Sequence, residues 1–132
     1  MDVGNPSNFV RLQSAFEYDL IKMREEISCY AVTDEETLQA IRNVYHHTAR
    51  IIDPHTAVGV RAAIQYSAQI KNTIPIIVTA TAHHGKFPEV TEQALQQKFP
   101  EPPQLTDAQK KKKQSMLISA NYEIWKKLFL SL

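Results

Sequence analysis

The stretch at 74–79, IPIIVT, constrains the fold of this 132-residue chain more than any other. It is uniformly apolar rather than alternating, which is typical of a central strand that is covered on both faces. The other strand candidate is CYAV at 29–32, and a sheet of only two strands is marginally stable in water. We therefore predict an α/β fold whose short, mostly parallel sheet, with flanking helices, is incomplete in this chain alone.

Helical patterns occupy much of the remaining sequence. A threonine and a glutamate at 33–36 are spaced as a capping box, and the Asp-Pro pair at 53–54 is typical of a second helix start. On that second helix Gly59 and Ala63 are one turn apart, so another backbone can approach closely there. We assign residues 1–132 to a single segment of one domain. Within it, 99–132 is a C-terminal helical extension with Tyr122, Trp125, Phe129 and Leu132 on one face.

Composition excludes several classes of protein. Fifteen basic and fourteen acidic residues give a net charge of +1, so no global field favours nucleic acid or an anionic membrane. The lysine run at 110–113 is expected to be solvated surface, because no aromatic residue interrupts it. Cys29 is the single cysteine, which excludes an internal disulfide. With no secretory or transit pattern at the start, a cytoplasmic location is expected.

The segment after the predicted central strand is rich in groups that can bind a ligand. Ligands of open α/β sheets bind beyond the carboxyl ends of strands, where TATAHHGKF at 79–87 would lie. Thr79 and Thr81 share one face of an extended chain. Threonine is also an ordinary strand residue, so the pattern alone leaves open a purely structural role. The adjacent histidines His83 and His84 lack the spacing and the further ligands that a metal site needs.

Several stretches, taken in order, resemble the C-terminal portion of threonine synthases. They are MDVGNPSNF at 1–9, TDEETLQAI at 33–41, DPHTAVGV at 53–60, TATAHHGKFPEV at 79–90 and ANYEIWKKLF at 120–129. The resemblance covers essentially this whole chain and about the last third of a family member. Because the stretches occur in the family's order and spacing, the combination is specific.

The resemblance implies a pyridoxal-phosphate (PLP) enzyme of the tryptophan-synthase-β fold type that converts O-phosphohomoserine and water into threonine and phosphate. In such enzymes a lysine forms a Schiff base with the cofactor, and a separate loop holds the cofactor phosphate. Both features belong to the part of the family that this sequence does not match. The chain is therefore expected to bind PLP only together with the missing N-terminal part.

Individual site residues follow from the same resemblance. Thr81 matches the hydroxyl that meets the pyridine nitrogen, and Asp53 matches a polar residue near the cofactor ring. His55 and His83 are motif residues with supporting roles toward the substrate, and Lys86 offers charge to the substrate phosphate. None of these residues is expected to be catalytic. The sequence departs from the family pattern at 84–85, where the family has proline and alanine, and this change affects the loop that carries Lys86.

Two readings of function follow. In the first, the chain is the C-terminal segment of a threonine synthase-like lyase and is inactive without the remaining domains, which lie on the same or another polypeptide; its expected partner is the remainder of a threonine synthase chain or a second copy of itself. In the second, the chain is a non-catalytic threonine synthase-like remnant that binds another protein through its uncovered sheet edge and apolar faces. Neither reading involves nucleic acid or a membrane.

Overall fold

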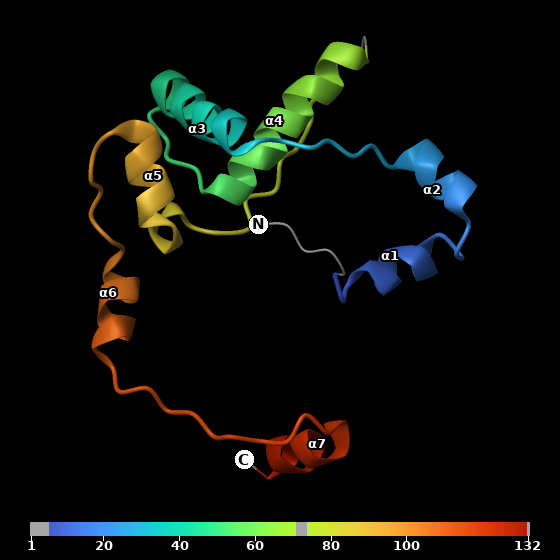
Figure 1. Ribbon diagram of the computed structural model, residues 1–132, viewed down its shortest axis with the longest axis vertical. Helices are drawn as coiled ribbons and strands as arrows, with labels where there is room; N and C mark the ends of the chain where they lie inside the picture. The colour runs from blue at the N-terminus through green and yellow to red at the C-terminus, as the bar shows by residue number, and fades with distance from the viewer. Residues whose placement is uncertain (1–5, 71–73, 132) are drawn as a thin grey trace. The chain divides into compact units, whose positions relative to one another are not determined.

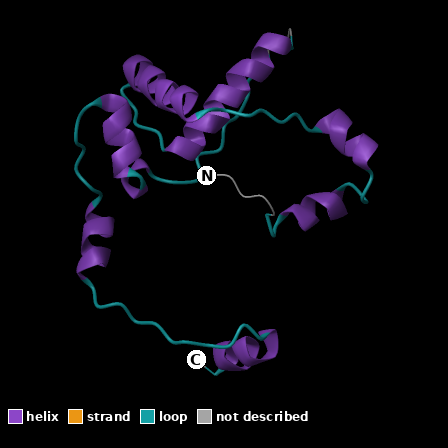
Figure 2. Ribbon diagram, in the orientation of Figure 1, coloured by secondary structure: helices purple, strands orange, loops and turns teal. Residues whose placement is uncertain are grey.

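A computed structural model describes residues 6–70 and 74–131, and its ordered elements in this part of the chain are helices (Figures 1 and 2). They are α1 (Phe9–Ala15), α2 (Leu20–Glu26), α3 (Asp34–Thr48), α4 (Pro54–Gln69), the 3₁₀ turn η1 (His84–Lys86), α5 (Pro88–Leu95), α6 (Pro103–Lys110) and α7 (Tyr122–Leu130). The chain divides into two compact units, Met1–Phe99 and Pro100–Leu132, and each is described by itself. No helix in the described part is long and apolar enough to cross a membrane.

The predicted α/β fold with a short parallel sheet is wrong for this chain, because no residue in 6–70 or 74–131 forms a strand. Residues 29–32 and 75–80 are extended but unpaired with one another. Ile76 and Ile77 are 42% and 90% exposed, whereas a central strand would bury them. The physical reason is that a strand requires hydrogen bonds to a neighbouring strand, and neither extended segment lies beside one. The apolar sequence of 74–79 predicted a buried strand, but the described residues include no neighbouring strand that would cover it.

The core lies where α3 packs against both α4 and α5 (Figure 1). Its fully or almost fully buried apolar residues are Ala40, Ile41, Ala57 and Ala94, with Leu38, Ile52, Val90 and Leu95 packed around them. Both predicted helix starts are confirmed. The Thr33 hydroxyl accepts from the Glu36 N–H while the Glu36 carboxylate accepts from the Thr33 N–H, and Asp53 caps α4.

The small-residue patch on α4 has a close neighbour, but this neighbour is a side chain and not the predicted backbone. A Cβ atom added at Gly59 would lie 3.0 Å from Cγ1 of Val78, so the extended segment passes close to the helix at this position. A groove of about 400 Å³ beside this contact is lined by Gly59, Ala63 and residues 76–79, among others. The α4 surface thus holds the segment that leads into 79–87, the stretch expected to carry a site.

The second unit consists of locally formed helices. Asn121 caps α7, and its side-chain oxygen accepts from the N–H groups of Glu123 and Ile124. The rings of Tyr122, Trp125 and Phe129 stack along one face of α7, as predicted, while Leu132 lies outside the described residues. Neither α6 nor α7 contains a buried residue.

Candidate functional site

The start of α4 is organised by the carboxylate of Asp53, which is 1% exposed. Its Oδ1 accepts from the backbone N–H of His55 at 2.9 Å and of Thr56 at 3.3 Å, and its Oδ2 accepts from the Thr56 hydroxyl. Burial alone would raise the pKa of Asp53. The hydrogen bonds from Thr56 and His55 outweigh burial and hold that pKa below its ordinary value of 3.8. Asp53 is therefore a charged carboxylate, and both of its oxygens accept hydrogen bonds from the first turn of α4.

His55 links the start of α4 to the segment before α5. Its Nδ1 lies 3.2 Å from Oδ1 of Asp53, and its ring centroid lies 5.0 Å from that of Phe87. The His55 side chain remains 44% exposed. The fold thus brings together two stretches, 53–56 and 83–87, that the sequence analysis singled out separately.

The η1 turn is closed by histidine. The backbone N–H of the buried Gly85 donates to Nδ1 of His83 at 3.0 Å, and the Lys86 N–H donates to the His83 carbonyl at 3.0 Å. The rings of His83 and His84 lie 4.1 Å apart, centroid to centroid, at 32°. Burial, followed by repulsion from His83, holds the pKa of His84 below its ordinary value of 6.5, although the Asp53 carboxylate opposes this shift.

Thr81 and Lys86 are exposed, as are His55 and His83, but the polar groups of Thr81 and Lys86 have no partner among the described residues. Thr81 lies in extended chain, and in the described part of the molecule its hydroxyl has no protein partner. The Lys86 ammonium likewise forms no ion pair with a described residue. Both groups are therefore available to a ligand, whereas the oxygens of Asp53 are already engaged. Of the five predicted residues, Asp53 and His55 contact each other, His83 bonds within its own turn, and the side chains of Thr81 and Lys86 have no partner among the described residues.

Sequence reasoning missed two residues that build this region. Thr56 supplies the hydroxyl that pairs with Asp53, and its position three residues after a helix-capping aspartate was a usable signal. Phe87 contacts His55 across 32 residues of sequence, and no local pattern predicts such a contact. The described residues contain no group of three or more His, Cys, Asp or Glu side chains that could hold a metal ion.

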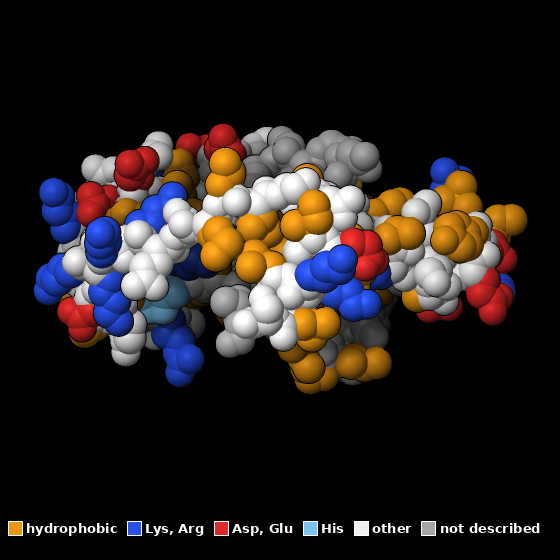
Figure 3. Space-filling model, turned by 90° about the horizontal axis from the view of Figure 1, so that it is seen from below, with side chains coloured by type: hydrophobic (Ala, Val, Ile, Leu, Met, Phe, Trp, Pro, Cys, Tyr) orange, Lys and Arg blue, Asp and Glu red, His pale blue; other side chains and the backbone are white. Residues whose placement is uncertain are grey.

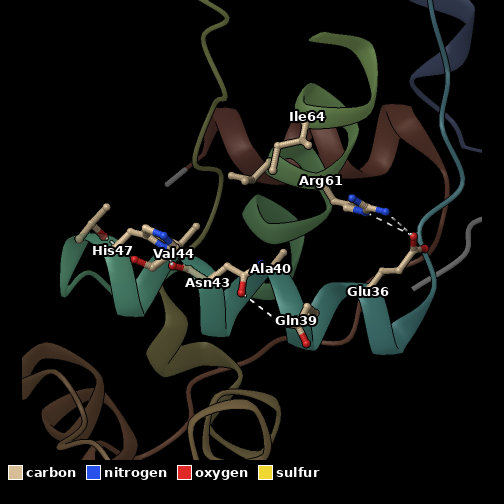
Figure 4. Close-up of a pocket in the computed structure, with 10 residues that line it drawn as sticks. Glu36, Gln39, Ala40, Asn43, Val44, His47, Arg61 and Ile64 are labelled. Carbon is tan, nitrogen blue, oxygen red and sulfur yellow. Dashed lines mark hydrogen bonds and ion pairs between the residues drawn. The ribbon is translucent and has the colours of Figure 1, made fainter. Parts of the chain in front are cut away.

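A separate groove of about 460 Å³ lies between α3 and α4 (Figure 4). Arg61 extends from α4 toward Glu36, and its Nη2 lies 3.0 Å from Oε1 of Glu36. Hydrogen bonds from Thr33, together with Arg61, hold the pKa of Glu36 below its ordinary value of 4.5. Gln39 Nε2 donates to Asn43 Oδ1 at 3.0 Å. Since these polar groups satisfy one another, the groove offers no free charge and we assign it no function.

Comparison with known proteins identifies similar sequences and one similar structure. Residues 56–128 match the family described as "Threonine synthase, C-terminal". Threonine synthase of Pseudomonas aeruginosa is 41% identical over 71 residues, which are 54% of this chain and 15% of that protein. Threonine synthase of Schizosaccharomyces pombe is 37% identical over 54% of this chain and 14% of that protein. Human threonine synthase-like 1 is 32% identical over 66% of this chain and 12% of that protein.

The similar structure is a PLP-bound threonine synthase from Brucella melitensis, with a TM-score of 0.62 and 24% identity. The match covers 97% of this chain and 32% of that one, so it supports a common fold for this portion. The chain spans about 15% of the length of the curated threonine synthases that it matches. These similarities agree with the resemblance seen in the sequence motifs.

Proposed function

This chain belongs to the threonine synthase C-terminal family, and from that premise we propose that it is the C-terminal segment of a threonine synthase-like, PLP-dependent lyase. The observation that carries the proposal is the contact between the stretches 53–56 and 83–87 through His55 and Phe87. Asp53 caps the helix at this contact, and Thr81 and Lys86 are exposed. The proposed overall reaction converts O-phosphohomoserine and water into threonine and phosphate. When bound, PLP supplies an electron sink for bonds to the substrate carbon beside the amine.

The residues of this chain fit one side of such a cofactor site. The Thr81 hydroxyl would accept or donate a hydrogen bond at the pyridine nitrogen, since no protein group engages it in the described structure. A neutral hydroxyl does not hold that nitrogen protonated as a carboxylate would, so the cofactor would withdraw electrons more mildly. The exposed ammonium of Lys86 would attract the substrate phosphate.

The other predicted residues would act by position. Because the oxygens of Asp53 are engaged by the start of α4, we propose that Asp53 places that helix end near the cofactor ring without hydrogen-bonding to the ring. His55 bridges Asp53 and Phe87, and His83 closes the turn before Lys86. These histidines would orient the substrate-facing loop.

Activity is proposed to require the remainder of a threonine synthase. The chain spans about 15% of its curated synthase relatives, and the apolar side chains of Ile76 and Ile77 are exposed beside α4. Hydrophobic side chains lie open on the face shown in Figure 3. A covering partner would bury these groups and complete the pocket, so we expect the isolated chain to be inactive.

The test combines this chain with the portion of the Pseudomonas aeruginosa synthase that precedes the matched region. Phosphate release from O-phosphohomoserine is expected from the mixture and from neither part alone. Thr81→Val should lower turnover about tenfold, the worth of one hydrogen bond, whereas Thr81→Ser should retain it. Thr79→Val is the matched control, because Thr79 is exposed in the same segment. An unchanged rate for Thr81→Val would remove Thr81 from the site.

A second candidate is a non-catalytic, protein-binding remnant. The exposed Ile76 and Ile77 favour it, and a relative named threonine synthase-like 1 is also similar to the chain. This reading predicts that the chain unfolds cooperatively as a monomer and neither binds PLP nor associates with the synthase portion. Association measured by analytical ultracentrifugation, with activity in the mixture, would exclude it.

A further inference from the structure

The closure of the η1 turn depends on the protonation state of an imidazole. Nδ1 of His83 accepts from the Gly85 N–H at 3.0 Å, so Nδ1 must carry a lone pair and no proton. An imidazolium ring donates at both nitrogens and accepts at neither. Protonated His83 therefore cannot make this bond, and the Gly85 N–H, which belongs to a buried residue, would lose its partner.

The second ring makes the pair respond as a unit. His84 lies 4.1 Å from His83, centroid to centroid, so two imidazolium charges would repel each other strongly. Other titratable or charged groups near the turn come from several elements. Lys86 lies on the turn, the Asp53 carboxylate at the start of α4 acts on His84, His55 contacts Phe87 directly after the turn, and Tyr45 contacts Phe99, whose ring faces that of His84. Glu89 and Glu92 on α5 and Lys98 after it follow the turn in the sequence.

Among these groups, the Asp53 carboxylate favours a proton on His84, while burial and His83 disfavour it more strongly. The neutral pair is thus the form that fits the closed turn.

We propose that the His83–His84 pair is a proton-operated latch, which holds the η1 turn closed when both rings are neutral and releases it when the pair takes up a proton. Release would free the segment that carries Thr81 and Lys86 while leaving the α3–α4–α5 core in place. The latch is independent of the proposed enzymatic function, because it requires neither cofactor nor partner.

The sign of the pH effect follows from proton binding. His84 binds a proton less readily in the folded chain than in the unfolded one. The part of the folded-state stability that is linked to a neutral His84 is therefore fully present above about pH 6.5, the ordinary value, and is lost as the pH falls below it. The folded chain opens the turn to accept the proton, instead of holding an imidazolium in the closed geometry.

The test follows the Gly85 amide in the ¹⁵N-labelled 132-residue chain between pH 5.5 and pH 7.5. Protection of Gly85 against hydrogen exchange, corrected for the intrinsic rate, is expected to fall about tenfold at the lower pH. His83→Asn should stay protected at both values, because asparagine accepts from the same i+2 N–H and does not titrate. His83→Ala should be unprotected at both.

The matched control is His46→Asn, which replaces an exposed histidine of α3 and should leave the wild-type step unchanged. Equal wild-type protection at the two pH values would overturn the latch, and so would a step that survives in His83→Asn. Loss of far-ultraviolet helical signal over the same pH range would also overturn it, since the whole core and not the turn would then be opening.

Discussion

The α3–α4–α5 core and the segment after Pro100 both contain capped helices, but only the helices of the core bury side chains. Asp53 caps α4 and Asn121 caps α7, each accepting from two backbone N–H groups. In the first region Ile41 and Ala57 are completely buried, whereas α7 buries nothing. Caps and amphipathic spacing thus suffice to form a helix, while burial depends on a neighbour that supplies a second apolar face.

Truncating a buried side chain tests this comparison most severely. Ile41→Ala removes the largest fully buried apolar side chain and should lower the free energy of unfolding by about 2–5 kcal/mol. Leu117→Ala, at a fully exposed side chain of the second unit, should change it by less than about 0.5 kcal/mol. Urea unfolding followed by circular dichroism measures both. Equal effects would show that the two regions are packed alike.

Removing the two helix caps sharpens the comparison. Asp53→Ala should cost about 2–3 kcal/mol, because the cap is lost and the buried Thr56 hydroxyl loses its acceptor. Asn121→Ala should cost about 0.5–1 kcal/mol of local helix stability. Urea unfolding of the core and ¹³Cα shifts of α7 report the two losses. A larger effect at Asn121 would reveal tertiary packing of α7.

Acid should weaken the core through Asp53. Its carboxyl has a lower pKa in the folded chain than its ordinary 3.8, so its contribution is present above about pH 3.8 and is lost as the pH falls below that value. Asp53→Asn keeps a capping oxygen that does not titrate and should flatten this part of the stability profile. Unfolding free energies measured from pH 5 to pH 2.5 would decide. An identical slope in the variant would assign the loss to other carboxyls.

The smallest expected effect is spectroscopic. Trp125 is the single tryptophan and is 44% exposed on α7. Its emission should remain characteristic of a solvated indole and change little while urea unfolds the α3–α4–α5 core. A cooperative emission change that coincides with core unfolding would contradict the difference between the regions. In the mixture with the synthase portion, a blue shift would indicate that a partner covers this face.

Local sequence predicted the starts of α3 and α4 correctly and the sheet incorrectly. Asp53 before Pro54 and the 33–36 box act through bonds within four residues, so the amino-acid order determines them directly. Gly59 has a close neighbour, but that neighbour is the Val78 side chain and not the backbone that was predicted. The contact of His55 with Phe87 was not predictable, because it depends on how α4 and η1 fold together.

The amino-acid sequence by itself determined where helices begin, which stretches resemble threonine synthases, and which polar residues gather around 53–56 and 79–87. Only the tertiary structure decided that 74–79 forms no strand and leaves Ile76 and Ile77 exposed, that the Asp53 carboxylate is engaged by the start of α4, and that His83 closes a turn. The reason is that a cap or a turn is satisfied by atoms a few residues away. A strand needs hydrogen bonds, and a core side chain needs packing, from a segment that is distant in the sequence. An apolar pattern indicates that such a segment is required, but it does not show whether the chain provides one.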